Sequence, residues 1–92
     1  MYQINTFIKC SELYDEYVIV DTRTGEYYEL NEIGNLFFRE IITAKDEKSA
    51  ISSLQEKIEA SPETLTVEYR KFIKKLVDDG IVVNKRVEAN DE

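Results

Sequence analysis

The stretch from Glu26 to Gly34 constrains the fold more than any other, because it changes from the pattern of a strand to that of a helix. Its first half, Glu-Tyr-Tyr-Glu-Leu, suits the half-buried surface of a β-sheet. Asn31 then offers a side-chain oxygen to the free amides of a first helical turn. Residues 17–20 form another β-rich run upstream, and Gly25 can close the turn between the two in the left-handed conformation. The sequence therefore predicts a hairpin whose second strand, 26–30, leads directly into a helix.

Three strands are predicted in the first third of the chain, over residues 3–10, 16–21 and 26–30, with a polar connection from Ser11 to Asp15. Because short links join antiparallel neighbours, these strands should form an antiparallel meander. Its third strand would then lie at an edge, and no proline or lysine within that strand protects the edge. Tyr28 and Leu30 should face the helices, while Tyr27 and Glu29 face away.

The rest of the chain has helical periodicity, which predicts helices over residues 32–42, from Asp46 to about 60, and over 62–79. Asp46 and Ser61 are expected N-caps, and Gly80 should end the third helix. Residues 81–83 either pack back or add a short strand, and residues 84–92 form a polar tail. Strands followed by helices that cover one face of the sheet predict an α+β fold, in one domain over residues 1–83.

The charge and composition of the chain argue against several classes of function. Twelve basic and nineteen acidic residues give a net charge of −7, which repels phosphate backbones. The chain has no histidine and a single cysteine, Cys10, and its glycines form no phosphate-binding loop. We therefore expect no enzymatic activity, no cofactor, no metal site and no nucleic-acid partner. The lone cysteine fits a half-buried strand position in a cytoplasmic protein, and no apolar run approaches the roughly 20 residues of a membrane span.

The order and spacing of several residues resemble those of the PqqD-like proteins. The family's pattern has a hydrophobic strand ending in Leu-Asn, then two residues and a glycine. A phenylalanine, a leucine and a Gly-Leu or Gly-Ile pair near the third helix complete it. The matching residues are Leu30, Asn31, Gly34, Phe72, Leu76, Gly80 and Ile81. The resemblance covers roughly residues 4–83.

This resemblance implies a recognition element for precursor peptides that are made ribosomally and then modified. Such domains are winged-helix-like units of three strands and three helices, and they do no chemistry themselves. They bind the leader segment of a precursor as an added strand against the third strand, in the groove beside the third helix. The implied partners are the leader peptide and a leader peptidase or modifying enzyme. A free-standing chain of this length is similar to the discrete versions in lasso-peptide pathways.

Carried onto this chain, the resemblance assigns leader binding to the third strand and to a basic flank of the third helix. The strand residues are Glu26, Tyr27, Tyr28, Glu29 and Leu30, and the basic residues are Arg70, Lys71, Lys74 and Lys75. These cations could steer an acidic leader. They could equally be a solvated helix face with acidic partners such as Glu68 and Asp78. Tyr28 and Leu30 could likewise serve the core as well as the groove.

Two other functions remain open from the sequence. A winged-helix DNA-binding regulator has a similar topology, with residues 62–79 as its recognition helix, although the acidic net charge counts against it. A homodimer could instead pair the edge strand with its own copy. No membrane partner is expected from the composition.

Overall fold

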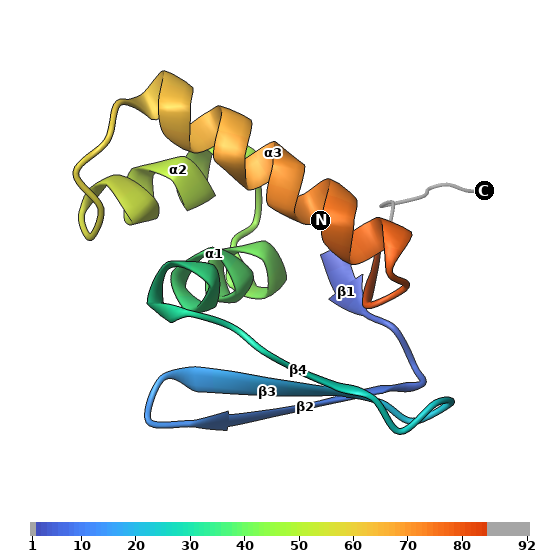
Figure 1. Ribbon diagram of the computed structural model, residues 1–92. Coiled ribbons are helices and arrows are strands. Elements are labelled where there is room, and N and C mark those ends of the chain that lie inside the picture. The colour runs from blue at the N-terminus through green and yellow to red at the C-terminus, as the bar shows by residue number, and fades with distance from the viewer. Residues whose placement is uncertain (1, 85–92) are drawn as a thin grey trace.

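The computed structural model describes residues 2–84, which form three helices and five short strands (Figure 1). In chain order the elements are β1 (Tyr2–Ile4), β2 (Ile8–Leu13), β3 (Glu16–Asp21), β4 (Tyr27–Glu29), α1 (Glu32–Thr43), α2 (Glu47–Gln55), α3 (Pro62–Asp78) and β5 (Val82–Asn84). The predicted tail over residues 84–92 falls outside the described residues except for Asn84, which belongs to β5. No described helix is both long and apolar enough to cross a membrane.

The main sheet has the strand order β2-β3-β4, and both pairs are antiparallel. Helices cover one of its faces: α1 lies next to the sheet, while α2 and α3 lie beyond α1 (Figure 1). The predicted α+β class, with a three-stranded antiparallel sheet and three helices, is therefore confirmed, and the arrangement is compatible with a winged helix. The middle of the core is formed by four buried residues: Ile19 of β3, Phe38 and Ile41 of α1, and Leu76 of α3.

The predicted first strand, residues 3–10, is in fact two strands that belong to different sheets. β1 pairs with β5, with Gln3 opposite Val83, and β2 pairs with β3. Asn5 separates them: its backbone amide donates to the carbonyl of Ile81 at 2.9 Å and its side-chain amide donates to the carbonyl of Gly80 at 3.1 Å. These bonds hold β1 against the end of α3, so the chain leaves the main sheet at this point. Of the two alternatives for residues 81–83, the short strand is the one that forms, over Val82–Asn84.

The predicted polar connection from Ser11 to Asp15 is wrong, because β2 continues to Leu13, which pairs with Glu16. Only Tyr14 and Asp15 remain for the turn, and both have positive φ angles, 54° and 64°. Two such residues give the tight turn whose twist matches that of its flanking strands. Tyrosine is uncommon in the left-handed conformation, so the local sequence did not indicate this turn.

The turn between β3 and β4 has the predicted form. Gly25 has a φ of 81°, and the amide of Asp21 donates to the carbonyl of Glu26 at 2.8 Å. The buried carboxylate of Asp21 accepts hydrogen bonds from Arg23, through Nε at 3.1 Å and Nη2 at 2.9 Å. The guanidinium of Arg23 lies 3.6 Å from the centroid of the Phe7 ring. The turn is thereby fixed against the start of β2.

All three helices begin at their predicted caps. The side chains of Asn31, Asp46 and Ser61 accept hydrogen bonds from the backbone amides of Gly34, Ser49 and Thr64. The second helix is shorter than predicted, because it ends at Gln55 in a tightened turn in which the amide of Glu56 donates to the carbonyl of Ser53 at 3.2 Å. Tight i→i+3 bonding of this kind is common at helix ends.

Candidate functional site

The free edge of β4 is the first part of the candidate site. β4 pairs with β3 on one side, and no other described strand pairs with it. The amide of Asp21 donates to the carbonyl of Glu26, so these two opposing residues form a hydrogen-bonded pair. Hydrogen-bonded and non-hydrogen-bonded pairs alternate along antiparallel strands, so every second pair from this one is also hydrogen-bonded. Tyr28, opposite Ile19, is therefore bonded toward β3. The amides and carbonyls of Tyr27 and Glu29 instead point toward the open edge.

The side chains of this strand lie as the alternation predicted. Tyr28 and Leu30 are partly buried and pack against the core, so their core role is established. Tyr27 is 66% exposed, and Glu29 is exposed as well. The strand is shorter than the predicted 26–30: Glu26, which is also exposed, precedes it, and Leu30 follows it.

A groove of about 320 Å³ begins where the chain leaves β4, between the first turn of α1 and one flank of α3. The α1 side of the groove consists of Asn31, Ile33, Gly34 and Phe37, and the α3 side consists of Glu68, Lys71, Phe72 and Lys75. The rings of Phe37 and Phe72 meet edge to face, with their centroids 6.1 Å apart. The groove thus has an aromatic base and charged residues on one side.

Close packing explains the glycine in the first turn of α1. A Cβ at Gly34 would lie 3.1 Å from the Asn31 side-chain oxygen and 3.3 Å from the Cβ of Leu30. Both approaches are tighter than ordinary van der Waals contact. Gly34 therefore lets the end of β4 turn sharply into α1 beside the groove.

The four basic residues predicted as one cluster lie on two different flanks of α3. Lys71 and Lys75 line the groove, whereas Arg70 and Lys74 line a second cavity of about 650 Å³ on the other flank. Each residue of a helix is rotated by roughly 100° from the previous one, so positions four apart share a flank and neighbours do not. The structure thus brings two of the four basic residues to the groove.

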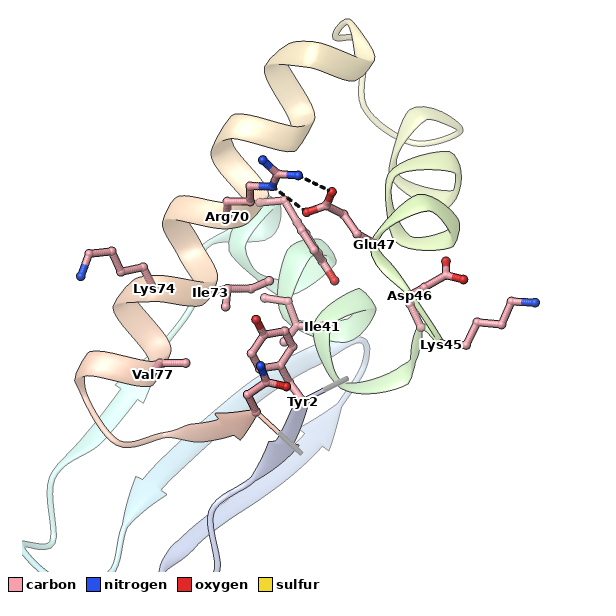
Figure 2. A pocket seen from close by; sticks show the side chains of 12 residues that line it. Tyr2, Ile41, Lys45, Asp46, Glu47, Arg70, Ile73, Lys74 and Val77 are labelled. Atoms are coloured by element: carbon pink, nitrogen blue, oxygen red, sulfur yellow. Dashed lines mark hydrogen bonds and ion pairs between the residues drawn. The ribbon is translucent and has the colours of Figure 1, made fainter. Parts of the chain in front are cut away.

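Each of these cations has an acidic neighbour. Arg70 donates two hydrogen bonds of 2.8 Å to Glu47 of α2 (Figure 2), and this contact lowers the pKa of the Glu47 carboxyl. Lys71 lies 3.7 Å from Glu68, and Lys75 lies 3.4 Å from Asp79. Such exposed lysine pairs contribute little and exchange readily with other partners. Arg70 is therefore bound to Glu47 of α2, while Lys71 and Lys75 remain able to bind an acidic ligand.

Sequence reasoning placed only Lys71 and Lys75 of the groove residues in the binding site. It missed the other six: Asn31, Ile33, Gly34, Phe37, Glu68 and Phe72. Ile33 lies on the apolar stripe that the helical period defines over residues 32–42, yet it is 49% exposed. The apolar positions of α1 form an arc that extends past the core, and this extra width was the available indication of a second contact surface.

The described residues offer few groups for chemistry. They contain no cluster of three or more His, Cys, Asp or Glu side chains arranged to hold a metal ion. Burial raises the pKa of the Cys10 thiol, with a further contribution from Glu12, so the thiol form is favoured over the nucleophilic thiolate.

The chain belongs to the PqqD family: the family described as coenzyme PQQ synthesis protein D (PqqD) matches residues 16–82. The resemblance inferred from Leu30, Asn31, Gly34 and the end of α3 is thereby confirmed. Among curated proteins, no sequence is significantly similar to this one.

Two solved structures share the fold. One is described as "Lasso peptide synthetase B1 complexed with the leader peptide"; it is 17% identical, with a TM-score of 0.79 over 90% of this chain and 98% of that chain. The other is described as "TbiB1 in Complex with the TbiA(beta) Leader Peptide"; it is also 17% identical, with a TM-score of 0.78 over 91% of this chain and 98% of that chain. At this identity the likeness concerns the fold.

Proposed function

We propose that this chain is a non-catalytic module that captures the leader segment of a ribosomally made precursor peptide and presents it to a leader peptidase or modifying enzyme. The observation that carries the proposal is the open edge of β4, which ends at a groove between α1 and α3. Two proteins that share the fold are described as complexes with leader peptides, which supports this function. Lasso-peptide biosynthesis is the pathway class that these relatives favour.

The leader would add as a strand beside β4. The outward amides and carbonyls of Tyr27 and Glu29 would supply main-chain hydrogen bonds, and alternate leader side chains would point toward the groove. Phe37 and Phe72 would contact an apolar leader side chain. Lys71 and Lys75 would attract acidic leader residues.

We further propose that the protein acts in the cytoplasm and binds the leader with one copy of the chain. An unpaired Cys10 fits the reducing cytoplasm, where a precursor peptide is made. A β4 edge that receives a leader cannot also pair with a second copy, so the bound form should contain one copy of the chain for each leader.

No observation favours the alternative of a DNA-binding regulator. A recognition helix needs a face of uncompensated cations. The net charge of −7 repels phosphate backbones, and the four basic residues of α3 are divided between two flanks of the helix instead of gathering on one face.

The first experiment is fluorescence anisotropy with a labelled leader peptide of the pathway and, as a control, a labelled DNA duplex of unrelated sequence. We expect the peptide to bind with a dissociation constant below about 1 µM and the duplex not to bind. Binding of the duplex alone would support the regulator. Binding of neither would contradict the proposed function.

A further inference from the structure

No described element covers the face of the main sheet that points away from the helices (Figure 1). Side chains on this open face form rows across the strands, because directly opposing residues share a face. One row contains Lys9, Val20 and Tyr27, and the next contains Ser11, Val18 and Glu29. Both rows end at β4. Tyr27 and Glu29 are therefore the open-face side chains next to any strand that adds to the free edge.

A strand added to this edge extends each row by one residue. Its side chains alternate between the two faces of the sheet, so its residues beside Tyr27 and Glu29 are two positions apart. The residue between them faces the helices, beside Tyr28. This spacing is the same whether the added strand runs parallel or antiparallel to β4. The open face of β4 therefore contacts two side chains of the added strand that are separated by one residue.

Tyr27 provides an apolar neighbour for the first of these side chains. It is 66% exposed, and its partner on β3 is Val20. Aromatic side chains pair favourably with aromatic or β-branched neighbours on the same face of a sheet. Such a neighbour would also remove apolar surface of Tyr27 from water. The residue beside Tyr27 should therefore be aromatic or β-branched.

Glu29 provides a negative charge for the second side chain. It is exposed, and it forms no ion pair with any other residue that the structure describes. The other members of its row are Val18 and Ser11, so the row contains no cation. Opposite charges in directly opposing positions stabilise a sheet, and like charges there destabilise it. The residue beside Glu29 should therefore be lysine or arginine, and an acidic residue there is disfavoured.

We propose that Tyr27 and Glu29 select leaders whose added strand carries an aromatic or β-branched residue and, two positions away, a lysine or arginine. This inference rests on the proposed function, because it requires the leader to add as a strand beside β4. On the other face of that strand, Lys71 and Lys75 of the groove favour acidic side chains. The two faces of the leader strand thus carry opposite charges. A register shift of one residue would bring like charges together, so this pattern also fixes the register.

The test of Glu29 is a scan of the labelled leader peptide of the pathway, in which each residue is replaced in turn by lysine and by aspartate. Anisotropy at low salt measures the affinity of each peptide for the wild type and for Glu29→Lys. At one leader position we expect the wild type to prefer lysine about fivefold and Glu29→Lys to prefer aspartate by a similar factor. Glu29→Ala, which only removes the charge, should weaken leader binding by no more than about threefold.

Glu16 gives a matched control for net charge. It is exposed on the same face of the sheet, but it lies opposite Leu13 and beyond the end of β4. Glu16→Lys changes the net charge of the chain as much as Glu29→Lys does. It should leave the preference for lysine at that leader position unchanged.

The test of Tyr27 uses the spacing between the two leader positions. Tyr27→Ser should weaken leader binding about threefold, whereas Tyr27→Phe should retain it. The loss in Tyr27→Ser should disappear when the leader residue two positions from the lysine-selective one is replaced by serine, because the pair is then already broken. Circular dichroism should show that all the variants are folded. A general loss of stability would not produce coupling at this one leader position.

A scan in which Glu29→Lys reverses the preference at no leader position would overturn the inference. A reversal that Glu16→Lys also produces, or coupling of Tyr27 to a position other than the one two residues away, would overturn it as well. If Glu29→Pro abolishes leader binding while no position reverses, strand addition stands and the inference alone fails. A leader that does not bind the wild type would contradict the proposed function itself.

Discussion

The side-chain oxygen of Asn35 accepts a hydrogen bond of 2.7 Å from the backbone amide of Tyr17, eighteen residues earlier in the chain. The amide nitrogen of the same side chain donates to the carbonyl of Leu30 at 3.1 Å. Tyr17 and Leu30 are opposite one another where the next rung of the β3–β4 ladder would fall. The buried Asn35 amide therefore completes the ladder at the point where β4 leaves the sheet for α1.

Replacing Asn35 with leucine should destabilise the protein. The change leaves the buried amide of Tyr17 without a partner, which costs about 2 kcal/mol of unfolding free energy. For a domain of this size we expect Tm to fall by roughly 10 °C. Thermal unfolding followed by circular dichroism checks this. A loss below about 0.5 kcal/mol would show that water replaces the side chain without cost.

Proline in β4 should act differently at adjacent positions. The Glu29 amide points to the open edge, so Glu29→Pro should remove a hydrogen bond to the leader and abolish leader binding in a folded protein. The Tyr28 amide is bonded toward β3, so Tyr28→Pro should instead disrupt the sheet.

The measurement for these variants is leader-peptide anisotropy together with far-ultraviolet circular dichroism. Glu29→Ala is the matched control, since it keeps the amide and should retain leader binding. Undiminished leader affinity in folded Glu29→Pro would exclude strand addition at this edge.

Charge reversal in the groove should depend on salt. The double variant Lys71→Glu, Lys75→Glu places two negative charges beside Glu68. We expect leader affinity to fall about tenfold at 20 mM salt and by less than about threefold at 500 mM, because salt screens exposed charges. The salt dependence of anisotropy titrations measures this. Equal losses at both salt concentrations would mean that these lysines act by shape rather than by charge.

Stability at acid pH should depend on Asp21. Hydrogen bonds from Arg23 hold the pKa of this carboxyl below its ordinary value of 3.8. A lowered folded-state pKa means that the stabilisation is fully present above about pH 3.8 and is lost as the pH falls through the folded value. Tm of the wild type should therefore converge toward that of Asp21→Asn between pH 4 and pH 2. A constant difference in Tm across that range would contradict the assignment.

Stability at alkaline pH should depend on Tyr69. Burial, with smaller contributions from Glu40 and Glu47, raises its pKa from 10.0 to about 12. The neutral hydroxyl is favoured in the folded state, so the stabilisation is present below pH 10 and is lost as the pH rises toward 12. Absorbance at 295 nm should show tyrosine ionisation near pH 12 that Tyr69→Phe removes. Ionisation of Tyr69 near pH 10 would place its hydroxyl in contact with solvent.

The sequence alone determined the features that depend on near neighbours in the chain. Asn31, Asp46 and Ser61 each satisfy an amide three residues later, so a helix start is a local property. Gly25 likewise closes its turn because its own backbone conformation allows it. The alternation of Tyr27 and Tyr28 fixed which side chains face the core, since the strand period is two.

Only the tertiary structure decided what depends on contacts between distant residues. Asn5 ends β1 because it bonds to Gly80 and Ile81, more than seventy residues away. The helical period puts the basic residues of α3 on two flanks, but only packing decided that one flank faces α1 across the groove and the other faces α2, β1 and Ile41 of α1 across the cavity. Periodicity assigns a residue to a flank, but the partner of that flank follows from how the helices pack, and this packing set the groove apart from the cavity.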